Sequence, residues 1–344
     1  MKSIDLENIT EEELLKTKIC DLPISIKGSW LEECVHQLYE ELDAKGIHFK
    51  PECYLSDEWL SPLNETCIGI PFYLAHPTLI KIEKKIMLEA EGETKAWCMK
   101  LLRHEAGHTL NHAYRLYRRK KWQELFGSPS TEYKDTYKYR PYSKNFVHHL
   151  DGYYAQYHPD EDFVETFAVW LTPGLDWPVR YKGWGVLRKL QYVDQVMNEI
   201  KNTPTPNQSS RKYWRLSSLR MSLNHYYKKK RLSWAEDLPD FHDLFLKKTF
   251  TELTQETIKW KKAFHIIRKY RREIVYQISR SSGERKYIIN DLIKDISKRC
   301  QELKLVTQDE DLIVVLKITS YITALIMNYL YTGRFQGTIK RKLK

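Results

Sequence analysis

The segment 101–112, LLRHEAGHTLNH, constrains this chain more than any other stretch of its sequence. His104 and His108 stand four residues apart, so on a helix they lie on one face, about one turn from each other. Two imidazole nitrogens placed in this way can share one small cation, and Glu105 can reach a water molecule beside it. The HExxH spacing therefore predicts a zinc site of the hydrolase type, with Glu105 as general base.

The residues around this motif favour a helix. The run 94–117 contains no proline and only one glycine. Large side chains and the motif histidines recur along it at helical spacing, at Trp97, Leu101, His104 and His108. We therefore expect the motif in the middle of a helix, where a shared cation requires it. The alternative is a helix that carries two ordinary histidines.

A catalytic zinc ion takes three protein ligands and keeps one position open, so one more ligand is needed. The longer motif HExxHxxGxxH does not supply it, because its Gly and last His positions hold Asn111 and Tyr114 here. His112 lies one further turn along the same helix. Three ligands on one straight helix cannot surround a cation, so we interpret His112 as a packing residue or as a partner of a ligand.

Carboxylates on a second predicted helix are the remaining candidates. Pro and Asp at 159–160 mark its start, and Pro and Gly at 173–174 mark its end. Glu161 and Glu165 are four residues apart on one face of this helix. They would repel each other unless a positive group lies beside them, which a zinc ion and a zinc-bound imidazole would provide. On this reasoning either glutamate can be the third ligand.

Together the two motifs resemble those of the gluzincins, in which HExxH is followed by a helix with ExxxE or ExxxD. The segment EDFVETF, 161–167, is closer to the corresponding helix of the anthrax lethal factor and Pro-Pro endopeptidase group. The longer segment HPDEDFVETFAVWLTPG, 158–174, is similar to a bacterial family called putative zinc-binding metallopeptidases. The resemblance covers about residues 20–230 and is strongest at the two motifs.

The resemblance implies roles for individual residues. His104, His108 and Glu161 would bind one zinc ion, and Glu165 would orient the far ring nitrogen of His104. In the lethal factor group a tyrosine seven residues before the ligand carboxylate points at the substrate carbonyl, and that position is Tyr154 here. The swapped assignment, with Glu165 as the ligand, stays open.

These residues predict an endopeptidase that hydrolyses peptide bonds with one zinc ion. Zinc lowers the pKa of its bound water and polarises the scissile carbonyl. Glu105 takes the proton from the zinc-bound water and passes it to the leaving amine. The resemblance implies that Tyr154 would donate a hydrogen bond to the developing oxyanion. A zincin fold that hydrolyses another kind of bond is an alternative.

A tyrosine-rich stretch, 127–159, lies between the two motifs. It contains Tyr133, Tyr137, Tyr139, Tyr142, Tyr153, Tyr154 and Tyr157. A segment this long without regular structure is usually functional or disordered, and so many aromatic residues argue against disorder. We expect it to lie over the active-site cleft, with ordinary surface packing as the alternative.

Composition and patterning predict an α+β chain with two domains. Segments of 46–87, the last of them Thr78–Met87, are expected to form strands of one small sheet. With the HExxH helix and the glutamate-bearing helix, this sheet would form a zincin-like metallopeptidase domain over 1–205. The Pro-, Ser- and Asn-rich residues 206–210 would be a linker, and 211–344 a basic all-α domain.

Positive charge is concentrated in the second predicted domain. Residues 211–344 contain 30 Lys plus Arg and 14 Asp plus Glu, whereas residues 1–210 contain 26 and 31. Basic clusters stand at 211–220, 228–231, 259–262, 268–272 and 340–344. Such a surface could bind nucleic acid or another acidic partner. The rival function is therefore a nucleic-acid- or chromosome-associated protein whose zincin core is inactive or acts on DNA-bound proteins.

The N-terminal sequence and the cysteines predict a cytoplasmic location. The first residues, MKSIDLENITEEELL, have no apolar core of signal-peptide length. The six cysteines include no CxxC pair, so a second zinc site is not expected and the thiols should be reduced. The apolar run 312–331 contains Lys317, so we expect a core helix there and no transmembrane segment. A peptide or protein would be the substrate.

Overall fold

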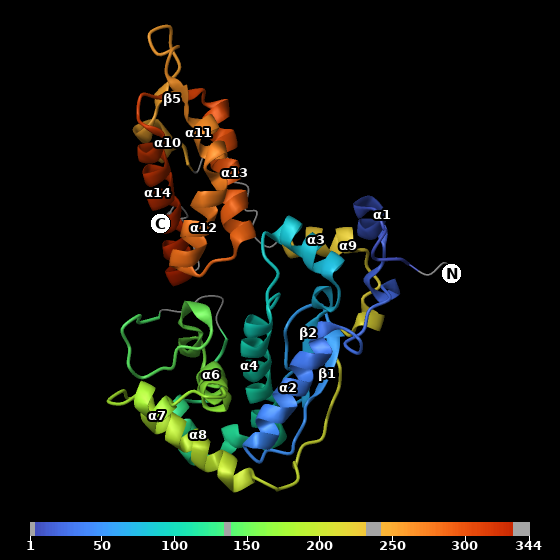
Figure 1. Cartoon of the computed structure of the whole chain (residues 1–344). Helices are drawn as coiled ribbons and strands as arrows, with labels where there is room; N and C mark the ends of the chain where they lie inside the picture. Colours follow the sequence, from blue (N-terminus) through green and yellow to red (C-terminus); the bar gives the residue numbers. More distant parts are fainter. Residues whose placement is uncertain (1–3, 134–138, 232–241, 333–344) are drawn as a thin grey trace, which may run out of the picture. The chain divides into compact units, whose positions relative to one another are not determined.

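The computed structural model describes residues 4–133, 139–231 and 242–332, and it contains two compact units (Figure 1). The first unit comprises Met1–Ile86 and Ala90–Tyr227, and the second comprises Met87–Glu89 and Lys228–Lys344. Tyr137 and the basic cluster 340–344 lie outside the described residues. Helices and two small sheets make up both units, which is compatible with the α+β class.

The first unit is built from helices and one pair of strands. Its helices, together with the one that leads out of it, are α1 (Glu11–Lys16), α2 (Trp30–Ala44), α3 (Pro77–Met87), α4 (Lys95–Ala113), α5 (Lys120–Phe126), α6 (Pro159–Leu171), α7 (Trp177–Arg180), α8 (Leu187–Ile200) and α9 (Leu223–Arg231). The strands β1 (Glu52–Ser56) and β2 (Cys67–Pro71) run parallel, with Tyr54 opposite Gly69.

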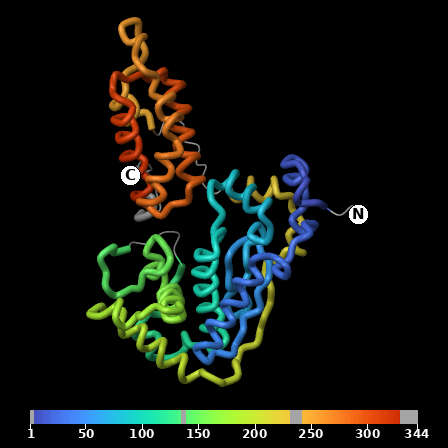
Figure 2. Tube along the Cα trace, viewed as in Figure 1, coloured from blue at the N-terminus to red at the C-terminus, as the bar shows by residue number. Residues whose placement is uncertain are grey.

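Helix α4 lies at the centre of the first unit, and it carries the HExxH motif within its length, as the sequence predicts. It packs against α2 and β2 on one side and against α6 on the other, and α8 packs against α6 (Figure 1). The Cα trace in Figure 2 shows α4 between these two groups. Residues from Leu101 to Ala113 are buried without interruption. The histidines and the glutamate of the motif are therefore interior groups, which need partners.

Gly107 brings α4 and α6 close together. A Cβ at this position would lie 2.9 Å from Cβ of Val164 and 3.0 Å from its Cα. Because Val164 precedes Glu165 and follows Glu161 on α6, this contact sets the spacing between the motif histidines and the glutamates.

We expect Gly107→Ala to lower the unfolding free energy by about 1 kcal/mol or more. Overpacking a core typically costs about 1–3 kcal/mol, and alanine regains at most about 1 kcal/mol as a helix former. Urea titration followed by circular dichroism measures the difference. An unchanged or higher unfolding midpoint would show that α6 moves aside at no cost.

Thr78–Met87 is a helix, not the expected strand. Its apolar residues fit in part both the two-residue period of a strand and the 3.6-residue period of a helix. The buried positions Leu79, Ile82 and Met87 follow the helical spacing. Pro77 occupies the first helical position, where its missing N–H has no cost. The sheet of the first unit is thus reduced to β1 and β2 among the described residues.

The two units divide at 227/228, not at the segment predicted as a linker. That segment runs along the first unit, because Thr66 N–H donates to Ser209 O (2.8 Å) and Ser209 Oγ donates to Glu65 (2.6 Å). Residues after it also return to this unit, since Ile19 N–H donates to Met221 O (3.0 Å). Tertiary hydrogen bonds therefore order a stretch whose composition is typical of linkers.

The second unit is helical but not all-α. Its helices are α10 (Asp243–Thr249), α11 (Ala263–Lys269), α12 (Arg271–Ser282), α13 (Lys286–Glu302) and α14 (Asp311–Thr332), and the last four pack on one another (Figure 1). The prediction missed a sheet of β3 (Thr251–Glu252), β5 (Leu305–Thr307) and β4 (Lys261–Lys262) in that antiparallel order. Its centre is the buried strand β5.

Helix α14 contributes one face to the core of the second unit. Val314, Ile318 and Ile322 are buried there, whereas Leu312 and Leu316 are exposed. By length and composition alone, Asp311–Asn328 could cross a membrane. The prediction of a core helix therefore fits the buried face of α14 but not its exposed face.

Candidate metal centre

Two buried helices bring three potential ligands together. Helix α4 supplies His104 and His108, and α6 supplies Glu161. Glu161 Oε2 lies 3.2 Å from His104 Nε2 and 3.4 Å from His108 Nε2. One ligand atom from each of the three residues lies within 4.8 Å of the others, so this group could hold a metal ion.

The local sequence explains why α6 begins where it does. His158 is the residue before the helix, and its Nδ1 accepts a hydrogen bond from Asp160 N–H (3.1 Å). Its Nε2–H donates to Thr131 O (2.8 Å), which leaves Nδ1 free to act as this acceptor. Pro159 follows at the first helical position. This capping places two carboxylates, Asp160 and Glu161, in the first turn beside α4.

Each of the two imidazoles has a carboxylate behind it. His104 Nδ1 lies 2.8 Å from Glu165 Oε1, and His108 Nδ1 lies 2.8 Å from Asp160 Oδ2. The carboxylates are fixed in turn, because Glu165 Oε2 accepts from Leu150 N–H (2.9 Å) and Asp160 Oδ1 accepts from Asn111 (2.6 Å). Such partners hold metal-binding histidines in one tautomer and one ring orientation.

This hydrogen-bonding pattern fits a cation. A carboxylate accepts the proton on Nδ1, so the Nε2 lone pairs of His104 and His108 both face Glu161 Oε2. That oxygen is buried and makes no hydrogen bond to any described residue. With both imidazoles neutral, three acceptor atoms converge in the interior and require a shared positive charge, and nitrogen and carboxylate ligands suit zinc.

The charges of this group influence one another strongly. Burial lowers the pKa of His104, but its contacts with Glu161 and Glu165 outweigh burial and raise the pKa to about 10. Burial raises the pKa of Glu161, but His108 and His104 outweigh it and lower the pKa below its usual range. Protons and a metal ion compete for such nitrogens, because metal ligands must be deprotonated.

Glu105 has a buried carboxylate oxygen that takes part in no described hydrogen bond. Its Oε2 has no hydrogen-bond partner among the described residues, and the residue is 6 % exposed. Its backbone carbonyl, in contrast, accepts a hydrogen bond from Ser61 (3.0 Å). An unpaired buried carboxylate oxygen is costly, so its retention is typical of a functional group rather than a packing group.

Two tyrosines of the stretch 127–159 reach the metal-binding group. Tyr154 lies with its ring 5.6 Å from the ring of His104, and burial, with the charges of Glu161 and Glu105, raises its pKa. It therefore stays protonated and able to donate. The sequence did not single out Tyr133, whose hydroxyl donates to Glu161 Oε1 (3.1 Å) and whose ring stacks on His158 (3.8 Å).

His112 does not join the three ligand atoms. Its ring lies 6.3 Å from the ring of His108, and burial lowers its pKa to about 4. Its Nδ1 has no hydrogen-bond partner among the described residues. It is therefore a neutral ring packed against His108, which agrees with the packing interpretation.

Comparison with known proteins links this region to one family. Residues 86–175 match the family described as "Putative zinc-binding metallo-peptidase". The matched segment contains both α4 and α6, and hence all three potential ligands. The family description suggests zinc binding and peptide hydrolysis in broad terms. No curated protein and no solved structure shows a significant match, and the gluzincin subtype and the likeness to lethal factor stay predictions.

Proposed function

We propose that this protein is a zinc-dependent endopeptidase of the zincin type, with one zinc ion bound by His104, His108 and Glu161. The observation that carries the proposal is the convergence of three buried acceptor atoms, with both imidazoles backed by carboxylates. The family match over the same helices supports it. Oxygen and nitrogen ligands with this second layer of carboxylates are typical of catalytic zinc sites.

A zinc ion bound here supplies Lewis acidity, which makes water more acidic and a peptide carbonyl more electrophilic. The side chains of this chain do the rest. Glu105 accepts a proton from the attacking water and gives it to the leaving amine. Tyr154 donates a hydrogen bond to the carbonyl oxygen as negative charge develops on it. Glu165 and Asp160 hold the two imidazoles in position.

Metal removal tests this proposal. The chain purified without chelators should carry about one zinc ion, as a three-ligand catalytic site requires. It should cleave members of an undirected peptide library, lose this activity with 1,10-phenanthroline, and regain it with added zinc. Mass spectrometry of the library and metal analysis measure both. A metal-free preparation, or cleavage indifferent to the chelator, would contradict the proposal.

Binding of an anionic partner such as nucleic acid is a second candidate function, favoured by the surface of the second unit. The run 257–272 contains seven Lys and Arg and no Asp or Glu. A pocket of about 660 Å³ opens there, lined by Trp260, Lys261, Lys262, His265, Ile266, Lys269 and Asp311. Cations around an aromatic ring are suited to phosphates and stacked bases.

This second function predicts salt-dependent binding of single-stranded DNA. The full chain should bind an oligonucleotide with an affinity that falls steeply with salt. Replacing Lys261 and Lys262 by Gln should weaken binding and reduce the salt slope by about 1.4, since each phosphate contact to a single strand contributes about 0.7. The matched control replaces the adjacent pair Lys120 and Lys121 of α5. Equal effects of the two double variants would mean that net charge alone is responsible.

A further inference from the structure

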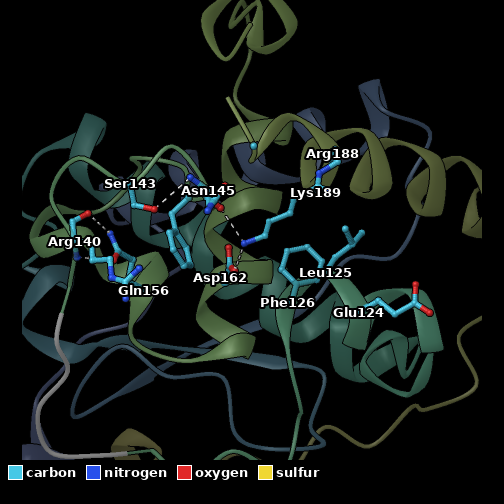
Figure 3. Close-up of a pocket in the computed structure, with 12 residues that line it drawn as sticks. Glu124, Leu125, Phe126, Arg140, Ser143, Asn145, Gln156, Asp162, Arg188 and Lys189 are labelled. Carbon is cyan, nitrogen blue, oxygen red and sulfur yellow. Dashed lines mark hydrogen bonds and ion pairs between the residues drawn. The ribbon is translucent and has the colours of Figure 1, made fainter. Parts of the chain in front are cut away.

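A pocket in the first unit has no part in the proposed peptidase chemistry. It has a volume of about 550 Å³ and lies between α6, α8 and the segment 140–156 (Figure 3). His104, His108 and Glu161 are absent from its described lining. The pocket instead contains both members of a buried ion pair, Asp162 and Lys189.

The ion pair forms a rigid base. Lys189 Nζ lies 2.5 Å from Asp162 Oδ2 and donates to Asn145 O (2.9 Å), as Figure 3 shows. Asp162 is 3 % exposed and Lys189 is 8 % exposed. The ammonium group also lies 4.4 Å from the ring of Phe146. Two charges are buried at such cost only when their geometry is well defined, so the base of this pocket is fixed.

One atom of this base lacks a partner. Asp162 Oδ1 is buried and has no hydrogen-bond partner among the described residues, although Oδ2 of the same carboxylate is paired with Lys189. A buried carboxylate oxygen without a donor is costly. The pocket therefore offers an acceptor to any ligand that brings an N–H or O–H group.

The rest of the lining adds positive charge and apolar surface. Arg140 and Arg188 are exposed and flank the ion pair, as Figure 3 shows, and neither forms an ion pair with a described residue. Glu124 is also part of the lining, but it lies 3.4 Å from Lys121. The walls include Phe126 and Phe146. Guanidinium groups bind carboxylates in a planar, two-pronged geometry.

Tight packing fixes the shape of one wall. A Cβ on Gly185 would lie 2.1 Å from Asn145 Oδ1. Val186 N–H donates to Lys144 O (3.0 Å), which ties the start of α8 to the segment that carries Asn145. These contacts fix the wall of the pocket that Gly185 and Asn145 form.

We propose that this pocket binds the carboxyl-terminal residue of a peptide. Its terminal carboxylate pairs with Arg188, the neighbour of Lys189 on α8. Its main-chain N–H donates to Asp162 Oδ1, and an apolar side chain lies against Phe126 and Phe146. A simple carboxylate would leave the Asp162 oxygen without a donor, which favours a peptide end over a free organic acid. The proposal does not rest on peptide hydrolysis at the metal centre.

Calorimetric titration of the full-length protein tests it with a matched pair of ligands, N-acetyl-Gly-Phe and its C-terminal amide. The acid should bind at least about tenfold more tightly, because the charge-assisted hydrogen bonds to Arg188 are lost with the amide. Mass spectrometry confirms that both ligands stay intact. The preference should persist in zinc-free protein, which separates this pocket from the metal centre.

Arg188→Gln should weaken binding of the acid about tenfold and bring it close to the amide. The control Arg180→Gln removes an exposed arginine of α7 that lies outside the pocket lining, and it should change nothing. Equal affinity for acid and amide, or equal effects of the two variants, would overturn the proposal. So would tight binding of 3-phenylpropanoate, which lacks the peptide N–H, or no binding at about 10 mM ligand.

Discussion

Replacing Glu105 by Gln should lower kcat by about 10²–10⁴-fold and leave the zinc content unchanged. The lower and upper values are those expected for loss of a general base. Gln has almost the same shape as Glu but cannot accept a proton, and Glu105 is not among the three convergent ligand atoms. The measurement is the rate of cleavage of a peptide found in the library screen, with metal analysis of the same preparation.

The stability of the Glu105→Gln variant distinguishes a catalytic role of Glu105 from a packing role. Glu105 Oε2 is buried without a hydrogen-bond partner among the described residues, so removing its charge should leave the melting temperature unchanged or raise it. A packing role would instead lower it. The matched control is Glu33→Gln on α2, whose side chain is 77 % exposed. Normal turnover by the Glu105→Gln protein would assign the base to another residue.

The convergence of His104, His108 and Glu161 was largely predictable because its geometry is local to two helices. The spacing of His104 and His108 fixes a shared face of α4, and the spacing of Glu161 and Glu165 fixes a shared face of α6. What spacing cannot give is the pairing across the helices. It could not show which glutamate faces the Nε2 atoms, and the sequence left both possibilities open.

The contacts of Asp160 and Tyr133 with this group could not be predicted from the sequence pattern. An aspartate in the first turn of a helix is usually explained by the helix dipole, so its contact with His108 Nδ1 has no separate signal in the sequence. The adjacency of an acidic pair, Asp160 and Glu161, was the only hint. Tyr133 lies 28 residues before Glu161, and only the fold of the intervening chain brings its hydroxyl there.

The errors in the fold have a common physical origin. Thr78–Met87 alternates apolar and charged residues over a short stretch, and burial against the rest of the unit selects the helical period instead. Residues 206–210 have the composition of a linker, yet Glu65 and Thr66 both form hydrogen bonds with Ser209 in this stretch. In both places tertiary contacts outweigh local preference, and a single sequence does not contain those contacts.

Glu161→Gln should weaken zinc binding by more than about 100-fold, and Glu165→Gln by only about 10–100-fold. Loss of a residue that orients a ligand typically costs about 10–100-fold in metal affinity, and loss of a ligand exceeds that range. In Glu165→Gln the amide nitrogen must face either His104 Nδ1–H or Leu150 N–H, so one hydrogen bond is lost while all three ligands remain. Competition with a chromophoric chelator measures both affinities.

Asp160→Asn is the counterpart of Glu165→Gln and should fall in the same range. Its two oxygens also accept from donors on both sides, His108 Nδ1–H and Asn111, and the substitution removes the negative charge that faces the His108 ring. Glu124→Gln, an exposed change on α5, is the control. If Glu165→Gln lost zinc while Glu161→Gln only weakened it, the third ligand would be Glu165. The convergence of the two Nε2 atoms on Glu161 Oε2 argues for the opposite result.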